Sequence, residues 1–318
     1  METLDTFEER REAVQDEETT GIGARLRRVG IVLFTIFAFL FFLVMKLPEA
    51  RIQNLVLAHM RILAQQQGML FTAEKVRVGM LLGPSLKIYN AELKSIDDEK
   101  QTLKIPYLKV RPHLLSLIGS TKKASISAEL LDGEIDGSVG AGPNAIVANL
   151  DLDDINIGST TLLKAFAPIE ASGLVNGRVK LDLDLENAQK SNGQINLNLT
   201  KLTLPAQTVY GFKAPTIAIS ETKIEIAIVN GAITIGAFDV GKDIKTDDLV
   251  AKVTGDGTLD KTLDRSSIKA KAVFQFSQSV MQSFPLLESL LEPAKTPDGK
   301  YGYQLNGPLM ALEARPGG

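Results

Sequence analysis

The sequence predicts a mainly β protein: an N-terminal transmembrane helix and a juxtamembrane helix, followed by a long curved, mostly antiparallel β-sheet domain with a few short helices. Three observations predict this class. Residues 29–45 form an apolar run without a charge, and residues 49–67 repeat apolar side chains at helix spacing. From Val76 onward, apolar and polar residues alternate with a period of two, which indicates strands with one buried and one solvated face.

The apolar run is expected to be an uncleaved membrane anchor. Extended to Leu47, it would form about 28 Å of helix, close to the roughly 30 Å hydrocarbon core of a bilayer. Pro48 would end the span because it has no N–H to donate. A cleaved signal peptide is the alternative, but its apolar core is usually shorter and a cleavage site of small residues follows it. Residues 46–50 match such a site poorly.

Charges on either side of the anchor predict its orientation. Five arginines precede it, and three basic residues follow it closely, at Lys46, Arg51 and Arg61. The positive-inside rule therefore places the N-terminus in the cytoplasm and the bulk of the chain on the far side. Residues 1–28 are polar and of mixed charge, which predicts a disordered cytoplasmic tail. This tail either docks a partner or is a solvated segment that only satisfies the topology.

Composition narrows the classes of function. The chain has 318 residues, enough for one large domain or two ordinary ones beyond the anchor. Its net charge of −3 and the lack of a basic stripe predict no nucleic-acid partner. Cysteine is absent from the sequence, which excludes disulfides, thiol chemistry and cysteine metal sites. Tryptophan is absent and aromatic residues make up 6%, which argues against a sugar-binding cleft.

Strands are predicted through most of residues 71–318. Alternation is strictest at residues 179–186 and 195–200. Its phase slips by one residue after Leu152 and after Leu199, which indicates β-bulges and favours a curved sheet over a flat sandwich. Pro106 hints that its strand lies at a sheet edge, because proline cannot donate to a ladder. Strands are predicted at 86–93, 103–110, 125–131, 223–229, 232–240, 249–259 and 267–276.

Few helices interrupt these strands. The helix at 49–67 is expected to stop at Gly68, and it either packs on the β-domain or lies at the membrane interface. Short helices are predicted at 112–118, 160–167 and 279–291, and Pro285 should kink or split the last one. Glycine-bearing segments at 133–137, 173–177 and 231–236 either form a weak repeat of hairpin units or arise by chance among 26 glycines.

The residues that usually carry chemistry are sparse. The two histidines, His59 and His113, have no plausible third ligand or nucleophile near them in the sequence. Acidic groups at 151–154 and 182–186 could serve hydrolysis or hold Ca²⁺, but acidic residues at alternate positions of a wet strand face need no such role. Residues 132–137 lack the spacing of an EF-hand loop. We therefore predict no enzyme, no cofactor, and no catalytic, cofactor-binding or metal-binding residues.

A surface that binds protein or lipid remains as the functional feature. A curved sheet with an apolar concave face could hold acyl chains. Alternatively, the helices at 112–118 and 279–291 cap that face and complete an ordinary core.

The order of these features resembles the type II secretion system protein N family and, more distantly, the AsmA-like envelope proteins. The segment that follows the juxtamembrane helix, residues 82–93 (LGPSLKIYNAEL), looks like the first strand of that family. Residues 105–119 (IPYLKVRPHLLSLIG) give the closest likeness: a strand, then Arg-Pro and a short leucine-rich helix. Residues 123–137 (KASISAELLDGEIDG) and 301–316 (YGYQLNGPLMALEARP) resemble the next strand turn and the closing strand pair.

The resemblance covers residues 29–316 and implies a single-pass inner-membrane protein. Its parts would be a cytoplasmic tail (1–28), a transmembrane helix (29–47), a juxtamembrane helix (48–70) and a periplasmic β-rich domain (71–318). The implied function is a non-catalytic component of the type II protein secretion system that contacts other secretion-system subunits in the periplasm. The alternative is an AsmA-like protein that binds or transfers phospholipid in an apolar β-groove. In either case the chain is attached to the membrane by its single transmembrane helix.

Overall fold

The computed structural model describes residues 49–79, 83–96, 101–160, 170–209, 212–261, 265–284, 286–309 and 311–317. The predicted tail and anchor lie outside these residues, as does the helix predicted at 160–167 apart from Thr160. Among the described helices, none has both the length and the apolar character needed to cross a bilayer. The chain divides into two compact units, Met1–Leu55 and Val56–Gly318.

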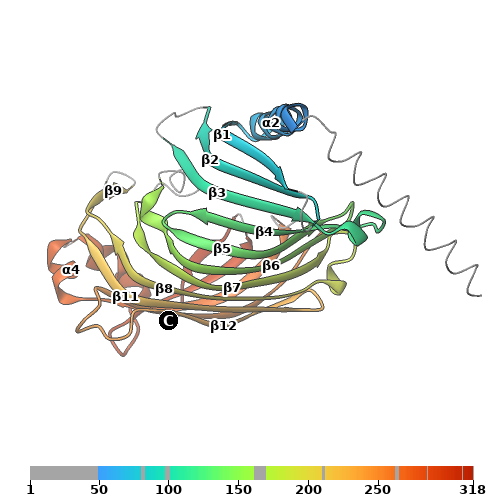
Figure 1. Cartoon of the computed structure of the whole chain (residues 1–318). Helices are drawn as coiled ribbons and strands as arrows, with labels where there is room; N and C mark the ends of the chain where they lie inside the picture. The colour runs from blue at the N-terminus through green and yellow to red at the C-terminus, as the bar shows by residue number, and fades with distance from the viewer. Residues whose placement is uncertain are drawn as a thin grey trace, which may run out of the picture. The chain divides into compact units, whose positions relative to one another are not determined.

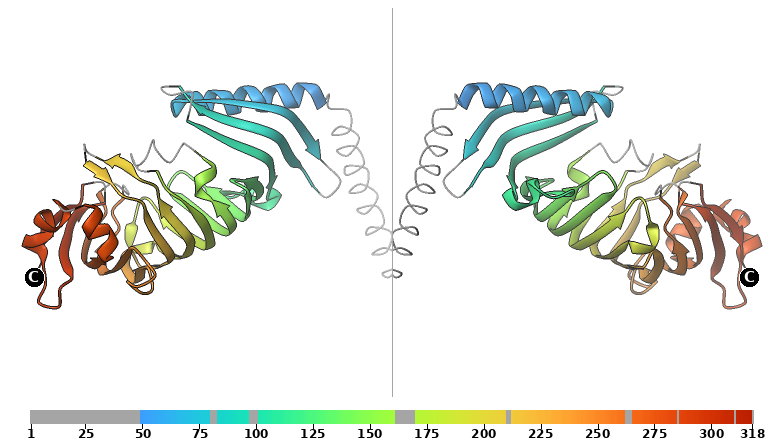
Figure 2. Two further views of the ribbon diagram at one scale, coloured as in Figure 1. Left: turned by 90° about the vertical axis from the view of Figure 1, so that its left-hand side faces the viewer. Right: turned by 90° about the vertical axis from the view of Figure 1, so that its right-hand side faces the viewer.

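The second unit confirms the mainly β prediction. It holds a 14-stranded antiparallel sheet in which each strand pairs with its neighbours in chain order, except that β9 and β10 form a separate hairpin between β8 and β11 (Figure 1). The long strands β5 to β8 are bowed along their length (Figure 1), and strand direction turns progressively across the sheet (Figure 2). The strands are β1 (Met69–Gly79), β2 (Ser85–Ser95), β3 (Thr102–Pro112), β4 (Lys122–Leu130), β5 (Gly133–Ala141), β6 (Ala145–Asn156), β7 (Ser172–Asp184), β8 (Asn192–Leu204), β9 (Gln207–Val209), β10 (Phe212–Ala214), β11 (Ile217–Val229), β12 (Ala232–Val240), β13 (Leu249–Thr258), β14 (Ser267–Phe276), β15 (Tyr301–Pro308) and β16 (Glu313–Pro316).

The described helices are short except for the first. The predicted helix at 49–67 is α2 (Glu49–Gln66), and Gly68 follows it with a positive φ of 70°. The predicted helix at 112–118 is the 3-10 helix η1 (Leu114–Leu117). The predicted helix at 279–291 is split into α4 (Gln278–Ser283) and α5 (Leu286–Leu291), as Pro285 led us to expect. The other 3-10 turns are η2 (Ile157–Ser159), η3 (Ala188–Lys190) and η5 (Glu292–Ala294).

Both predicted phase slips are irregularities in the sheet. The register between β6 and β7 shifts between Leu152 and Ile155, where Asp154 has a φ of 49°. On β8, Lys201 has a φ of 54°, beside a register shift in the pairing of β7 with β8. A left-handed residue in a strand lets the following side chains return to the same face after the slip. The apolar side chains therefore stay on one side of the sheet.

One sequence prediction needs correction. Strand pairing begins at Met69, ahead of the alternation seen from Val76. Pro106 is not on an edge strand, because β3 lies between β2 and β4. The ladder is interrupted at that point: the pairing with β2 skips Pro106, and the pairing with β4 begins at Tyr107. A proline without an N–H is therefore accommodated in an interior strand.

Two glycines of the suspected repeat occupy equivalent positions. Gly137 on β5 and Gly177 on β7 have φ values of 149° and 150°. A Cβ at Gly137 would lie 2.0 Å from the backbone oxygen of Asn149, and one at Gly177 would lie 2.1 Å from that of Asn196. Only glycine permits this close approach of neighbouring strands.

The tightest core lies under α2. Phe71, Val76, Ile88 and Ala91 form a buried cluster, and side chains from the C-terminal part of the helix, such as Val56 and Met60, pack against it. Of the two placements left open for this helix, packing on the β-domain is the one observed. This cluster therefore sits at the β1–β3 end of the sheet, and further buried apolar residues, such as Leu183 and Ile228, lie on later strands.

Candidate interaction surfaces

One face of the sheet is apolar across its full width. Cross-strand partners share a face in an antiparallel sheet, so the register identifies which side chains lie in a row. One such row crosses all fourteen strands and contains only aliphatic residues and glycine: Val78, Leu86, Val110, Ile126, Gly137, Leu150, Val179, Ile195, Ile226, Ile235, Gly255, Ala270, Leu305 and Ala314. We call the face that carries this row the apolar face.

The opposite face is polar. The neighbouring row begins with Arg77, Lys87 and Lys109 and continues through Ser127 and Asp136. Further along, Asp151 pairs with Arg178 at 2.5 Å. Residues that point to water on one face and to apolar neighbours on the other give the period-two pattern of the sequence.

Cover on the apolar face is uneven. Ile88, under α2, is 1% exposed. In the middle of the sheet, Leu150, Ile195 and Ile226 are only partly buried. Within the described residues, η1, η2, η3 and η5 contact β4, β7 or β15 next to the strand ends.

The two helices that could have capped the apolar face leave large side chains in water. On the turn that follows β3, Leu115 is 88% exposed and Ile118 is 90% exposed. On the split C-terminal helix, Val280 is buried, whereas Leu286 and Leu290 are exposed. The segment at 112–118 therefore does not close the apolar face.

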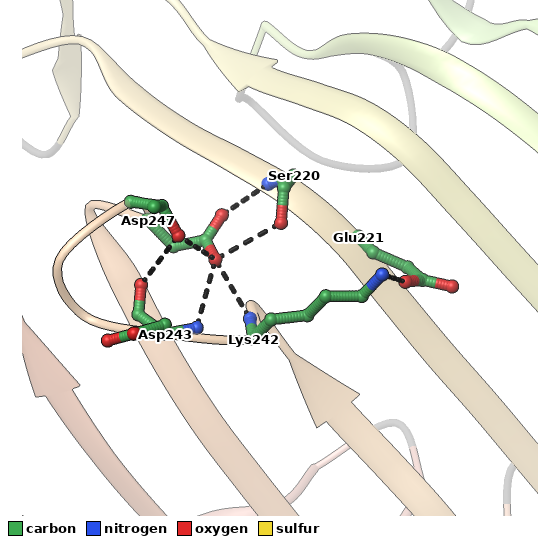
Figure 3. Close-up of polar contacts among 6 residues, drawn as sticks. Ser220, Glu221, Lys242, Asp243 and Asp247 are labelled. Atoms are coloured by element: carbon green, nitrogen blue, oxygen red, sulfur yellow. Dashed lines mark hydrogen bonds and ion pairs between the residues drawn. The ribbon is translucent and has the colours of Figure 1, made fainter.

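A buried carboxylate fastens the β12–β13 connection onto β11 (Figure 3). Asp247 is 2% exposed and accepts hydrogen bonds from the Ser220 N–H at 2.5 Å, the Ser220 hydroxyl at 3.1 Å and the Lys242 N–H at 2.8 Å. The Asp243 N–H donates at 3.2 Å. Burial raises the pKa of Asp247, but these hydrogen bonds outweigh burial and lower the pKa from 3.8 to about 2. The group is a structural anion held by donors on β11 and in the β12–β13 connection.

An exposed ion pair stands beside this carboxylate. The Lys242 ammonium contacts the Glu221 carboxylate (Figure 3). The hydrogen bond from Lys242 is the main reason why the pKa of Glu221 is lowered. Hydrogen-bond donors therefore favour the ionised form of both carboxylates.

The acidic groups that the sequence singled out serve turns and pairs. The Asp154 carboxylate accepts from the Asn176 side chain at 3.0 Å, and Asp132 accepts from Asn156 at 3.3 Å. Asp184 accepts the N–H groups of Asn187 and Glu186, and the bond from Asn187 is the main cause of its lowered pKa. In the described part of the chain, no group of three or more His, Cys, Asp or Glu side chains is placed to hold a metal ion.

The two histidines lie on different elements. His59 is exposed on α2, and His113 stands between β3 and η1, where its Nε2 lies 2.7 Å from the Ser125 hydroxyl. Sequence reasoning did not identify Asp247 or the aligned apolar row. The run Gly-Lys-Asp at residues 241–243 predicts a turn but not the burial of Asp247. Alternation along a strand does not show which residues are neighbours on the adjacent strands.

Comparison with known proteins assigns no relative: no protein-family model, no curated protein and no solved structure matches this chain.

Proposed function

We propose that this chain is a non-catalytic component of a type II protein secretion system, held in the inner membrane by residues 29–47 and acting through contacts in the periplasm. The order of the described elements supports this proposal. Strand β3 runs into Arg111-Pro112 and the leucine-rich η1, β5 begins at Gly133, and β15 and β16 form a last pair. These are the features on which the resemblance to that family rests.

The apolar row across fourteen strands is the observation that carries a binding role. With adjacent strands about 4.8 Å apart, it extends for roughly 60 Å across the sheet. A sheet is stable when its apolar face packs against another layer, and in a member of a multi-subunit machine a partner subunit can supply that layer. The expected contact is therefore broad and apolar.

A photo-cross-linking amino acid at Leu197, on the apolar face, tests this role in cells that carry the secretion system. The matched control places the same amino acid at Asn196, the next residue on β8, whose side chain lies on the polar face. Mass spectrometry then identifies the protein and lipid adducts of the full chain. Adducts to secretion-system subunits at Leu197 and not at Asn196 are expected. Equal adducts at both positions, or none to such subunits, would contradict the proposal.

Phospholipid binding is the second candidate, and the incomplete cover of Leu150, Ile195 and Ile226 favours it. Partly buried aliphatic side chains in a row form a surface on which acyl chains can lie. The same cross-linking experiment separates the two functions. Lipid adducts at Leu197 without subunit adducts would support an AsmA-like role. Leu183 lies on the same face of β7 as Val179 of the apolar row. Loss of these adducts in a Leu183→Lys variant that keeps its far-UV circular dichroism would strengthen this candidate.

A further inference from the structure

A protruding turn carries the most exposed aliphatic side chains in the described part of the sheet unit. Leu114, Leu115, Leu117 and Ile118 follow one another around η1, and we call them the leucine turn. Each is at least half exposed. A contiguous group of aliphatic side chains in water is unfavourable unless another surface covers it. The leucine turn is therefore a candidate contact surface separate from the apolar face.

Several backbone groups of the turn are hydrogen-bonded within residues 113–122. The Ser116 N–H donates to the His113 carbonyl at 2.9 Å, and the Gly119 N–H donates to the Ser116 carbonyl at 3.2 Å. The Lys122 ammonium donates to the carbonyls of Leu117 at 2.6 Å and Gly119 at 2.7 Å. A segment that enters hydrocarbon must satisfy its polar backbone groups internally. The four bonds satisfy two N–H groups and four carbonyls of the turn.

The charges beside the turn all have one sign. Residues 109–125 contain Lys109, Arg111, Lys122 and Lys123 and no acidic residue. On the polar face, Lys109 also continues the cross-strand row of Arg77 and Lys87. Aliphatic side chains rimmed by basic ones suit a membrane surface, where basic groups meet anionic headgroups and apolar groups enter the acyl region.

Arg111 lines two cavities, one beside the leucine turn and one on the polar face. One cavity of about 530 Å³ is lined by Arg111 together with Leu114 and Leu115. A second, of about 300 Å³, is lined by Arg111, Lys109, Ser125, Ser127 and the carboxylate of Asp136. Within the described residues, the buried Nε of Arg111 has no hydrogen-bond partner. Because that atom is buried, a headgroup phosphate would contact the exposed part of the Arg111 side chain, which as a whole is only partly buried.

We propose that the leucine turn inserts into the surface of a bilayer that contains anionic phospholipid, while Lys109, Arg111 and Lys123 contact headgroup phosphates. A pocket on a partner protein is less well matched, because the turn is highly exposed and the charged residues of segment 109–125 are all basic. Asp136 on β5 is an acidic residue that also lines the Arg111 cavity, but it lies outside this segment. This contact does not depend on the secretion role, since it rests on the leucine turn and its flank.

A single fluorophore can test the insertion in the full chain. The sequence has no cysteine, so Leu115→Cys provides one thiol for an environment-sensitive nitrobenzoxadiazole label. The labelled chain is reconstituted into vesicles of phosphatidylcholine, with or without phosphatidylglycerol, that carry nitroxide lipids. The matched control is Leu290→Cys, because Leu290 is also exposed but is flanked by Glu288 and Glu292.

At Leu115 we expect a blue-shifted emission and quenching by nitroxide lipids, both stronger with phosphatidylglycerol. At Leu290 we expect neither. Ile118→Cys should repeat the Leu115 result, which guards against a local effect of one label. Emission and quenching at Leu115 and Ile118 that equal those at Leu290 would overturn the proposal and leave a protein as the partner of the turn.

The charge part of the proposal has its own test. Lys123→Glu is added to the Leu115→Cys chain. Lys122 is not changed, because its ammonium donates hydrogen bonds to the carbonyls of Leu117 and Gly119. The preference for phosphatidylglycerol should be lost while the far-UV circular dichroism is unchanged. A preserved preference would contradict a role of the basic flank in selecting anionic lipid.

Discussion

One end of the apolar face and its middle differ in how their strands are stabilised. At β1–β3, the alternating residues Phe71, Val76 and Ile88 are buried because α2 packs on them. In the middle, at β8 and β11, Ile195 and Ile226 stay partly exposed, although Ile228, next on the same face of β11, is buried. The sequence patterns of the two regions are alike. Burial is therefore decided by what lies on the face and not by the alternation itself.

In the middle of the sheet, close approach of the strand backbones and buried polar hydrogen bonds contribute to stability. Gly177 brings two strands into close approach, and the Asp247 carboxylate ties the β12–β13 connection to β11. Such local devices hold strands in register without a second layer. They do not themselves cover Ile195 and Ile226 on the apolar face.

The largest expected effect contrasts the two regions directly. Ile88→Ala should lower the free energy of unfolding by about 3 kcal/mol, because it leaves a cavity under α2. Ile226→Ala should cost about 1 kcal/mol, since its side chain is only partly buried. Urea unfolding of both variants measures the difference. Equal losses would mean that the middle of the sheet is covered as fully as the end.

Gly177→Ala probes the fit of the middle strands. A Cβ there would lie 2.1 Å from the Asn196 backbone oxygen, so the strands must separate, and we expect a loss of about 2–3 kcal/mol. Gly299→Ala is the control, because Gly299 also has a positive φ of 77° but nothing lies near its Cβ position. Similar losses for the two variants would attribute the effect to backbone strain rather than to strand approach.

The Asp247 fastening predicts a pH dependence. Its folded pKa of about 2 lies below the ordinary 3.8, so the ionised group stabilises the fold above that ordinary value. By linkage, about 2 kcal/mol of stability is lost as the pH falls from about 5 through 2. Asp247→Asn should start less stable and lack this part of the pH dependence, whereas Asp243→Asn should keep it. Thermal unfolding at several pH values measures both, and parallel curves for wild type and Asp247→Asn would refute this role.

The smallest effect is expected on the polar face. Arg178→Gln removes the ion pair with Asp151, whose partners are both more than half exposed, and should cost less than about 0.5 kcal/mol. Urea unfolding at low and high salt checks this. A loss as large as that of Ile226→Ala would show that the two faces of the middle region contribute equally.

Several elements follow directly from residue patterns. The strands predicted at 232–240 and 267–276 coincide with β12 and β14, and the slip after Leu152 is the observed register shift. These predictions are confirmed because alternation depends only on adjacent residues, and because the apolar side chains of every strand lie on the same face of the sheet. The prediction that Pro106 lies on an edge strand was wrong, because the hydrogen-bond ladder is interrupted at Pro106 on both sides and needs no N–H there. That interruption depends on residues of two other strands.

The candidate surfaces were less accessible from the sequence. The leucine-rich segment at 112–118 was identified, but its exposure was not, since the same residues could have capped the apolar face. Asp247 appeared as one more acidic residue in a polar turn. Its burial depends on Ser220, which is 27 positions away in the chain. No local pattern reports a contact of that kind.

The sequence by itself determined that the chain alternates, which residues share a face within each strand, and where strands bulge or helices stop. These properties depend on backbone geometry over a few residues. Only the tertiary structure decided that the apolar rows align across fourteen strands, that α2 covers one end of them, and that the leucine turn stays exposed. Those outcomes depend on the register between strands and on packing between distant segments.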